Sequence, residues 1–431
     1  MESENKINFN DVIFADLHLH SKYSRATSSN LSFENLVKWA RVKGLNLLGT
    51  GDFTHPLWFE EIKKLVDRGN GFYYYTGNQR FPVSQTSNIS PEVQDKGFPF
   101  IITGEISLMY TQGRGRRIHL VVLVPSIEIA EKINSYFDTK GRRDYDGRPI
   151  FNISGEQFVK DMMKISEDIE IIPAHCMTPW FGLFGSNSGF DSLKECFGSE
   201  SEKIYAIESG MSADPEMLWR LDEKINIVSF SDSHSFWPWR LGREATIFDI
   251  PELTYENIIK AIRTSIGLVG TVETPPEYGK YHWDGHRLCK FSSPPEETKK
   301  LGGICPVCGK LLTIGVDSRV EEIAKFSVGH KSERAKMFYK LVPLHELISL
   351  NIGVAMASKK VWDVYNSLIR KFENEFNILL KISKEDLIKE KVDDKLIELI
   401  LKNRVGKIKV KPGFDGEYGK IELEEKQKSL F

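Results

Sequence analysis

The segment Val12-Ile-Phe-Ala-Asp-Leu-His-Leu-His20 begins as an apolar run and ends in acidic and imidazole side chains. Because side chains two residues apart on a strand share a face, His18 and His20 can meet one ion, with Asp16 near the same edge. The alternative is a polar strand that carries two surface histidines. Matching ligands on other strands would favour the first interpretation.

Six further apolar runs of strand length follow within the first 275 residues, with amphipathic stretches of helical period between them. Strands that alternate with helical patterns of roughly 10–15 residues indicate βαβ units and parallel pairing. We therefore expect an α/β fold, a closed or nearly closed barrel, with its chemistry in the loops after the strands. The expected strands are 12–17, 45–49, 98–102, 118–124, 169–173, 204–207 and 225–231, and the helices 33–42, 127–136, 157–166 and 255–263.

The later expected strands each carry a carboxylate or an imidazole at one end. Histidines that only pack in the core would not be expected to be distributed so evenly among the strands. Imidazoles with carboxylates are the mixed ligands of Zn²⁺, Mn²⁺ or Fe²⁺, and an acidic residue such as Glu105 or Asp232 can bridge two ions. We therefore predict a multinuclear metal site. The candidates are Asp52 with His55 nearby, Glu105, His119 at the start of its strand, His175, Glu208, and Asp232 with His234.

The composition is that of a globular protein. The chain has 431 residues, of which 41% are hydrophobic and 27% charged, which indicates two or three domains. Its longest apolar runs, such as residues 120–124, fall far short of the ~20 residues of a membrane helix. Five cysteines, two of them in Cys305-Pro-Val-Cys308, suit a metal clip in a reducing compartment. We expect an intracellular protein without a membrane segment.

The ligand set resembles the polymerase and histidinol phosphatase (PHP) family of metal-dependent phosphoesterases over roughly residues 10–270. The resemblance rests on His18-x-His20, Thr50-Gly-Asp52, Glu105, His119, His175 and Asp232-x-His234. It implies a distorted (β/α)7 barrel in which these eight His, Asp and Glu residues hold divalent ions, Zn, Mn or Mg. Asp52 stands at a position where the family usually has histidine. Ser24, Arg25 or Ala26 stands at a second position where the family often has histidine. Two ions are therefore implied, and a third stays open.

A second ligand set, His286-x₂-Cys289-x₁₅-Cys305-x₂-Cys308, has zinc-ribbon spacing. A segment of this size buries little core, so one structural zinc would supply folding free energy. The alternatives are free buried cysteines, or His282 as the ligand in place of His286. Cys176 and Cys196 have no partner at such a spacing, and we expect core or loop thiols there.

The alternation of strands and helices stops near Pro275-Pro276. We expect a metal-dependent phosphoesterase barrel over residues 1–275, a zinc-binding module over 276–340, and a helical, DNA-binding C-terminal domain with a short tail over 341–431, with helices at 361–372, 385–391 and 394–401. Lys402, Arg404, Lys407, Lys409 and Lys411 partly alternate with apolar residues, as in a strand or turn whose basic face follows phosphates. A solvated surface strand is the alternative. Arg114, Arg116 and Arg117 form a second basic tip with the same two interpretations.

Strings from all three segments, in this order, resemble the endonuclease Q family. They are Gly49-Thr-Gly-Asp-Phe-Thr-His-Pro56, Pro173-Ala-His-Cys-Met-Thr-Pro-Trp-Phe181, Gly185-Ser-Asn-Ser-Gly-Phe-Asp191, Gly279-Lys-Tyr-His-Trp-Asp-Gly-His-Arg287 and Pro412-Gly-Phe-Asp-Gly-Glu-Tyr-Gly419. That family nicks DNA on the 5′ side of deaminated bases (hypoxanthine, uracil, xanthine) and of abasic sites. The resemblance implies a DNA repair endonuclease that binds damaged double-stranded DNA, with Asp232, His18, His20 and Glu105 as catalytic residues.

Two ions about 3.5–4 Å apart can both activate a water and stabilise charge on the phosphate, and we expect Asp232 to bridge them. A damaged base must leave the stack to be read, so we expect a pocket for a flipped-out base beside the ligands. Trp180 and Phe181 could stack on this base, and Ser186 and Asn187 could read its edge. Alternatively, the aromatic residues pack under a structured loop. Residues 208–214 either line the pocket or cap the next helix.

Two other functions stay open. A phosphatase or phosphodiesterase for small metabolites would not need the zinc module and the basic tail, and a non-catalytic DNA-binding module would not need so complete a ligand set. The end, Gln427-Lys-Ser-Leu-Phe431, resembles the start of the peptide by which archaeal repair proteins bind the sliding clamp, and a frayed tail is the alternative. A repair enzyme of this kind is expected in the cytoplasm, at the nucleoid of an archaeon or bacterium.

Overall fold

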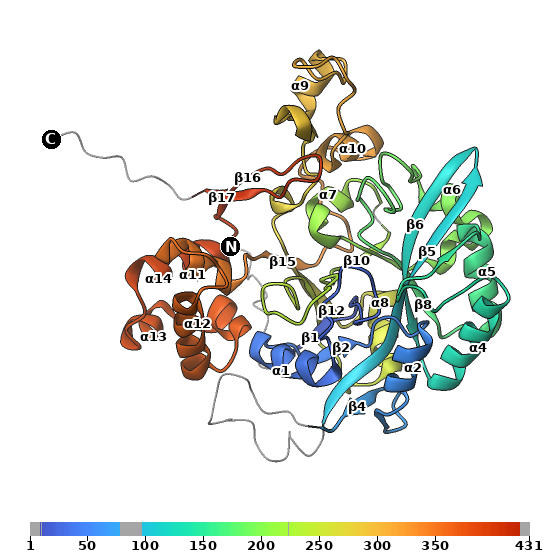
Figure 1. Ribbon diagram of the computed structural model, residues 1–431, viewed down its shortest axis with the longest axis horizontal. Coiled ribbons are helices and arrows are strands. Elements are labelled where there is room, and N and C mark those ends of the chain that lie inside the picture. Colours follow the sequence, from blue (N-terminus) through green and yellow to red (C-terminus); the bar gives the residue numbers. More distant parts are fainter. Residues whose placement is uncertain (1–8, 10, 78–96, 223, 423–431) are drawn as a thin grey trace.

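The computed structural model describes residues 9, 11–77, 97–222 and 224–422. Figure 1 shows a sheet with helices packed around it, a small segment that projects at the top of the view, and a cluster of helices at the left. The projecting segment carries α9 (Pro295–Lys300) and α10 (Val316–Ile323). The predicted mixed α/β class is confirmed. No helix of these described ranges is long and apolar enough to cross a bilayer.

All seven predicted strands are present, five in the central sheet and two beside it. The hydrogen-bonded order of the central sheet is β15-β12-β11-β1-β2-β5-β4-β3, with β6 and β7 on β5 and β8 on β6. Its strands are β1 (Ile13–Asp16), β2 (Leu47–Gly49), β3 (Val66–Asp67), β4 (Tyr73–Tyr75), β5 (Phe98–Gln112), β6 (Arg114–Val124), β7 (Ile150–Phe151), β8 (Glu170–Pro173), β11 (Ala245–Phe248), β12 (Leu268–Glu273) and β15 (Met337–Lys340).

The strands do not close into a fully hydrogen-bonded barrel within the described chain. β9 (Ala206–Glu208) and β10 (Asn226–Val228) form a separate parallel pair. Single backbone hydrogen bonds reach across the gaps, from Cys176 N to Glu208 O at 3.0 Å and from His20 N to Ser233 O at 3.1 Å. In place of a closed barrel, the strands therefore follow an interrupted ring.

The expected parallel pairing is wrong for β6, which runs antiparallel to both β5 and β8. β5 and β6 form a long hairpin that turns at Gly113, where φ is +70°. Glycine adopts this conformation without the steric cost of a Cβ atom. Consequently, in each pairing the earlier residues of β6 lie beside the later residues of β5 and β8. This direction explains why His119 lies at the start of its predicted strand, whereas the other candidate ligands follow theirs.

Serine or threonine starts the helices that cover the sheet. Ser32, Ser126, Ser154 and Thr254 each accept a hydrogen bond from the amide three residues onward. This contact satisfies one of the free donors of a helix N-terminus. The four predicted helices of this part are present, as α1, α4, α5 and α8. The helices are α1 (Phe33–Lys43), α2 (Pro56–Ile62), α4 (Ile127–Asp138), α5 (Gly155–Ile165), α6 (Leu193–Phe197), α7 (Pro215–Trp219) and α8 (Tyr255–Thr264).

The middle module has boundaries different from those that we expected. β15, inside the predicted range 276–340, pairs with β12 of the central sheet. Conversely, the hairpin of β16 (Lys409–Lys411) and β17 (Lys420–Glu422) packs on the module, since Trp283 N donates to Gly413 O at 3.0 Å and Gly419 N to Tyr278 O at 3.1 Å. The module, with β13 (Asp284–His286) and β14 (Phe291–Ser293), is therefore completed by the end of the chain.

A buried ion pair joins the C-terminal helices to α1. Lys43 Nζ lies 2.7 Å from Glu375 Oε1, and neither side chain is more than 2% exposed. Glu375 also accepts hydrogen bonds from Tyr365 Oη at 2.9 Å and Leu344 N at 3.0 Å. The pair is therefore satisfied on both sides and fixes how the helices meet the sheet domain. These helices are α11 (Leu344–Ile352), α12 (Lys359–Phe372), α13 (Lys384–Lys389) and α14 (Asp394–Arg404).

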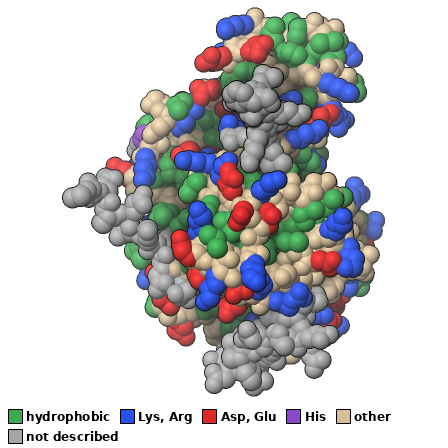
Figure 2. All heavy atoms as spheres, turned by 90° about the vertical axis from the view of Figure 1, so that its left-hand side faces the viewer, with side chains coloured by type: hydrophobic (Ala, Val, Ile, Leu, Met, Phe, Trp, Pro, Cys, Tyr) green, Lys and Arg blue, Asp and Glu red, His purple; other side chains and the backbone are tan. Residues whose placement is uncertain are grey.

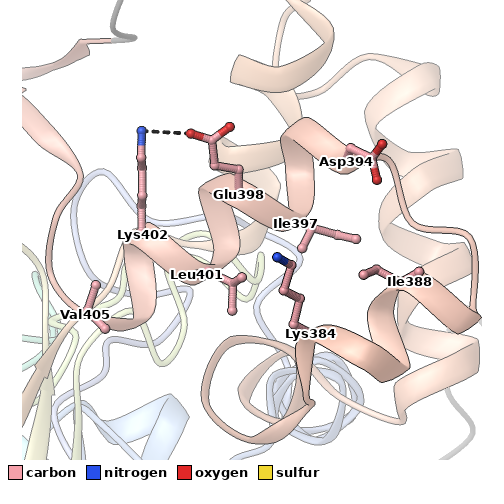
Figure 3. A pocket seen from close by; sticks show the side chains of 8 residues that line it. All are labelled: Lys384, Ile388, Asp394, Ile397, Glu398, Leu401, Lys402 and Val405. Carbon is pink, nitrogen blue, oxygen red and sulfur yellow. Dashed lines mark ion pairs between the residues drawn. The ribbon is translucent and has the colours of Figure 1, made fainter.

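Helices α13 and α14 border a surface groove (Figure 3). Ile388 and Val405 are exposed in it, at 52% and 61%, and Lys402 pairs with Glu398 at 3.0 Å. Figure 2, which views the molecule from the side of the C-terminal helices, shows basic and acidic side chains mixed over this face.

Candidate functional site

The fold brings six of the predicted ligands into two groups that share one carboxylate. The first group is His18, His20, Glu105 and Asp232, and the second is Glu105, His119 and His175. In each group one ligand atom of every residue lies within 4.8 Å of the others, and such groups can hold a metal ion. Glu105, rather than Asp232 as we expected, is the residue common to both groups.

The first group forms just after the ends of β1 and β10 and beside the middle of β5. His20 Nε2 lies 3.0 Å from Asp232 Oδ1 and 3.3 Å from Glu105 Oε2. His18 Nε2 lies 3.6 Å from the same Asp232 oxygen and 3.7 Å from Glu105 Oε1. His18, His20 and Glu105 are buried, whereas the Asp232 side chain is 31% exposed. One side of the group is therefore open to a ligand from solvent.

The second group lies on the other side of Glu105. His119 Nδ1 is 2.7 Å and His175 Nε2 is 3.1 Å from Glu105 Oε1. Burial, opposed by Glu105, lowers the pKa of His119 to about 4. This ring is therefore neutral at pH 7, the state in which an imidazole nitrogen binds a cation.

Several features of these residues fit divalent ions. His18 Nε2 is buried without a hydrogen-bond partner, so its coordinating atom is not satisfied by the protein. Burial opposes charge on Glu105, yet the surrounding groups, first His119 and then Arg148, hold its pKa well below the usual range. The carboxylate is therefore ionised, and a cation bound beside it would stabilise its buried charge. Two carboxylates and four imidazoles make a mixed donor set suited to Zn²⁺ or Mn²⁺.

A further carboxylate orients the ligands from behind. Glu208 Oε1 accepts a hydrogen bond from His18 Nδ1 at 2.9 Å, and Glu208 Oε2 accepts one from His175 N at 2.6 Å. A carboxylate on the second ring nitrogen fixes the tautomer of a metal-binding histidine. Glu208 is one of the acidic residues that end the expected strands, but it is not among the eight ligands that the PHP resemblance implies.

Two predicted ligands lie outside both groups. Asp52 sits behind His20, with Oδ1 3.0 Å from His20 Nδ1 and Oδ2 bonded by Ser21 N and Ser24 Oγ. His234 lies beside His20, with ring centroids 4.3 Å apart, and its Nδ1 lies 3.0 Å from Asp232 O. Asp52 thus has the geometry of an orienting residue, because its oxygens already have partners.

Three site residues adopt left-handed backbone conformations that non-glycine residues seldom use. The φ angles are +45° at Asp52, +30° at His175 and +48° at Asp232. Each lies shortly after a strand, where the chain must turn. Such conformations persist when the surrounding contacts determine them, and they cluster at functional sites.

Glu208→Gln is expected to weaken binding of Mn²⁺ by about 10- to 100-fold, the usual effect of losing an orienting carboxylate. The substitution keeps the shape of the side chain but removes the charge that fixes the His18 tautomer. Calorimetric titration with Mn²⁺ measures the change. Glu216→Gln, at an exposed carboxylate, is the matched control. Equal affinity of the two variants would show that Glu208 does not support the ligands.

A cavity of about 220 Å³ opens beside the second group. His119, His175 and Asp232 form its inner wall, so a molecule in it lies next to both groups. Aromatic and basic side chains from distant segments complete it. They are Trp180, Phe181, Phe230, Tyr281 and Tyr418, with Arg243 and Lys280.

The loop after His175 contributes only part of what we expected. Trp180 and Phe181 line the cavity, and the Phe181 ring lies 4.4 Å from that of His119. Ser186 and Asn187 do not line it: Ser186 Oγ donates to Ile314 O at 3.1 Å, and Asn187 N to Pro179 O at 3.0 Å. They fold the loop instead. Both interpretations of residues 208–214 hold, since Ser212 lines the cavity and Asp214 caps α7.

The four candidate zinc ligands of the middle module lie together. His286, Cys289, Cys305 and Cys308 bring their ligand atoms within 4.8 Å of one another. Cys308 Sγ lies 3.3 Å from His286 Nδ1, and Cys305 is fully buried. His282 is not part of this group. Cys176 and Cys196 are both buried, in the positions expected of core thiols.

The basic residues near the C-terminus are not on one strand. Lys402 and Arg404 belong to the last turn of α14, Lys407 follows it, and Lys409 begins β16. The Arg404 guanidinium donates to the carbonyls of Ile378, Leu379 and Ile382 at 2.8–3.0 Å. Arg404 therefore connects α14 to the backbone of residues 378–382, which precede α13.

At the other basic tip, Arg116 is buried and pairs with Glu195 at 2.6 Å. Arg117 is exposed, 5.9 Å from the Phe181 ring. Each of the two basic segments therefore combines an arginine that holds the fold together with basic side chains that are exposed. The tail 427–431, with its resemblance to a clamp-binding peptide, lies outside the described residues.

Comparison with known proteins relates this architecture to two solved structures. The crystal structure of the lesion-specific endonuclease PfuEndoQ from Pyrococcus furiosus matches with a TM-score of 0.81 and 29% identity, over 97% of this chain and 98% of that one. A complex of Endonuclease Q with a 27-mer duplex carrying an abasic lesion matches equally, over 97% and 100%. The chain has the endonuclease Q architecture. The resemblance predicted from the sequence is confirmed.

Other relatives of this endonuclease Q-like chain are known by sequence. The family model of the MJ0043 C-terminal domain matches residues 343–407. The uncharacterized protein MJ0043 of Methanocaldococcus jannaschii is 34% identical over 288 residues, which are 65% of this chain and 35% of that protein. The chain thus spans about a third of that relative. The uncharacterized protein YqxK of Bacillus subtilis is 24% identical over 95% of this chain and 99% of its own.

Proposed function

We propose that this protein is a metal-dependent DNA repair endonuclease that cuts the phosphodiester bond on the 5′ side of a deaminated base or an abasic site. The observation that carries the proposal is the position of the two ligand groups, joined by Glu105, at the inner wall of an aromatic cavity. The endonuclease Q architecture of the whole chain supports DNA as the substrate. We also propose that the interrupted ring of strands is a distorted PHP barrel.

The ligand groups would hold at least two divalent ions, with His18, His20 and Asp232 on one side of Glu105 and His119 and His175 on the other. When bound, such ions lower the pKa of water and stabilise charge on a phosphate. No protein nucleophile is then needed. The chain itself positions the ions through Glu105, Glu208 and Asp52, and it keeps the His119 ring neutral.

The cavity would receive the lesion nucleotide after it leaves the stack. Trp180, 38% exposed, has its ring 5.4 Å from that of Tyr281, so the two form an aromatic edge at the entrance. Arg243 and Lys280 add positive charge to the wall, which favours the phosphates beside the base. An aromatic wall accepts different bases as well as an empty sugar, because every base has a π-face.

In the middle module, we propose one structural zinc on the Cys₃His group. The module supplies Lys280 and Tyr281 to the cavity, and the hairpin that packs on it supplies Tyr418. The metal would therefore stabilise one wall of the site. We also retain exposed Lys407 and Lys409 as phosphate contacts, since they lie at the start of this hairpin.

Labelled duplexes that contain one hypoxanthine, one uracil, one abasic site or no lesion test the function. We expect a nick 5′ of each lesion in Mg²⁺ or Mn²⁺, none in the undamaged duplex, and none in EDTA. Phosphate release from nucleotides without nicking would instead indicate a metabolite phosphatase. Binding without cleavage in every metal would indicate a non-catalytic module.

Trp180→Ala is expected to weaken binding of the lesion duplex by about 10- to 100-fold, since stacking of a base on an aromatic side chain contributes roughly 1–3 kcal/mol. Binding of the undamaged duplex should change little, because no base enters the cavity. Fluorescence anisotropy in EDTA measures both affinities without cleavage. Trp237→Ala, at a tryptophan that is 36% exposed but does not line the cavity, is the control. An equal loss for both duplexes would argue against stacking in the cavity.

A further inference from the structure

Arg148 brings a permanent positive charge to the ligand groups. Its Nη1 lies 3.0 Å from Glu105 Oε2, on the carboxylate that both groups share. The Glu105 side chain is fully buried, whereas that of Arg148 is 25% exposed. The guanidinium therefore lies between the ligands and solvent, on the approach to the site.

The loop that carries Arg148 is built to hold it there. A Cβ atom on Gly147 would lie 2.1 Å from Asp52 Oδ2 and 2.3 Å from Ser24 Oγ, so the backbone packs directly against the residues behind His20. Gly147 N donates to Tyr23 O, and Thr54 Oγ1 donates to Gly147 O, both at 3.2 Å. On its other side the loop continues into β7, which pairs with β5. The position of Arg148 is thus fixed from two directions.

A role confined to neutralising Glu105 does not account for this arrangement. Glu105 already contacts the imidazoles of His18, His20, His119 and His175. Divalent ions in the two groups would satisfy the carboxylate further and would repel a neighbouring guanidinium. An anion that enters beside Arg148 would offset this repulsion, in addition to the nearby carboxylates of Asp232 and Asp146. A guanidinium presents five donors in a planar fork that matches two oxygens of a phosphate.

We propose that Arg148 is a catalytic residue that binds the non-bridging oxygens of the phosphodiester that is cut. This inference rests on the proposed function of the site. Hydrolysis forms a phosphorus–oxygen bond to water and breaks the one to the leaving sugar oxygen, while a proton of the water passes to that oxygen. Arg148 keeps all its protons and forms no covalent bond. It acts by stabilising the charge that develops on the phosphate.

Binding of inorganic phosphate to the Mn²⁺-loaded protein tests the inference without cleavage. A charged hydrogen bond is worth about 1.5–3 kcal/mol, so Arg148→Ala should weaken phosphate binding roughly 10- to 100-fold in calorimetry. Arg148→Lys should recover part of this affinity, because it keeps the charge but not the fork. Mn²⁺ content and melting temperature should stay near those of the wild type. Arg142→Ala is the control, at an exposed arginine in the same connection that pairs with Asp144.

Single-turnover nicking of a hypoxanthine duplex provides the second measurement. Arg148→Ala should lower the rate by about 10²- to 10³-fold, as the loss of a transition-state donor does. Added guanidinium ion should restore part of the rate of this variant but not change that of the wild type. Unchanged phosphate affinity, or loss of Mn²⁺ in step with the rate, would overturn the inference and leave Arg148 as a support for Glu105. A wild-type protein that cuts no lesion would instead refute the proposed function, while the phosphate titration still decides the role of Arg148.

Discussion

Glu105→Gln is expected to abolish the proposed nicking of a lesion duplex, with a loss on the order of 10³-fold or more, since stabilisation by a metal site amounts to several kcal/mol. Glu105 is the residue that the two ligand groups share, and four imidazoles lie within 2.7–3.7 Å of its oxygens. Glutamine keeps the volume but offers one neutral oxygen, so the second group loses its only carboxylate and the first group keeps only that of Asp232. We expect the bound Mn²⁺ per chain to fall together with the rate.

Metal analysis and single-turnover kinetics measure the two effects on the same preparation. Glu170→Gln is the matched control, because Glu170 is also fully buried and pairs with an arginine, Arg263, at 2.7 Å. It lies at the start of β8, whereas His175 follows the end of that strand. A Glu105 variant that keeps its metal and its rate would contradict our assignment of the site, whatever the result for Glu170.

Cys305→Ser is expected to release the proposed structural zinc and to unfold the middle module locally. Structural zinc sites contribute about 10–16 kcal/mol of apparent binding free energy, more than a small segment gains from its core. Cys305 is the one fully buried ligand of this described group, and a serine hydroxyl is a much weaker zinc ligand than a thiolate. We expect loss of one zinc per chain and faster amide exchange over residues 284–313.

Zinc analysis and hydrogen-exchange mass spectrometry check this result. Cys196→Ser, which alters a buried thiol 3.8 Å from Tyr110 Oη and outside the ligand group, should keep its zinc. The two metal groups of the central part should also keep their ions in the Cys305 variant. Unchanged zinc content and exchange after Cys305→Ser would refute a ribbon held together by metal.

The sequence predicted the strands that local composition specifies. Apolar runs that are followed by an acidic or imidazole residue predicted β1, β2, β8, β9 and β10 to within a few residues. The direction of β6 was not predictable from these runs, since it depends on the turn at Gly113 and on pairing along β5. The packing of the C-terminal hairpin on the middle module was not predictable for the same reason. Its contacts with the module join residues more than a hundred positions apart.

The predictable part of the site lies next to the apolar runs of the sequence. His18, His20, His175 and Asp232 follow strands, whereas Glu105 and His119 lie within the hairpin of β5 and β6, and the six side chains meet. The distinction between a ligand and a supporting residue was not visible, since Asp52 and Glu208 also follow strands and are separated from the ligands by side-chain direction alone. Arg148, Arg243 and Lys280 come from loops where a single cation carries no pattern.

The hairpin of β16 and β17 sets the order in which parts of the site can fold during synthesis. The backbone contacts of Trp283 and Tyr278 are made with Gly413 and Gly419, which leave the ribosome some 130 residues later. The four proposed zinc ligands are therefore all synthesised while the module is still open on one side. That wall of the cavity, with Tyr418, forms only after the hairpin has been synthesised. Ribosome-bound chains that end before residue 412 consequently carry the cysteines but an unfinished cavity.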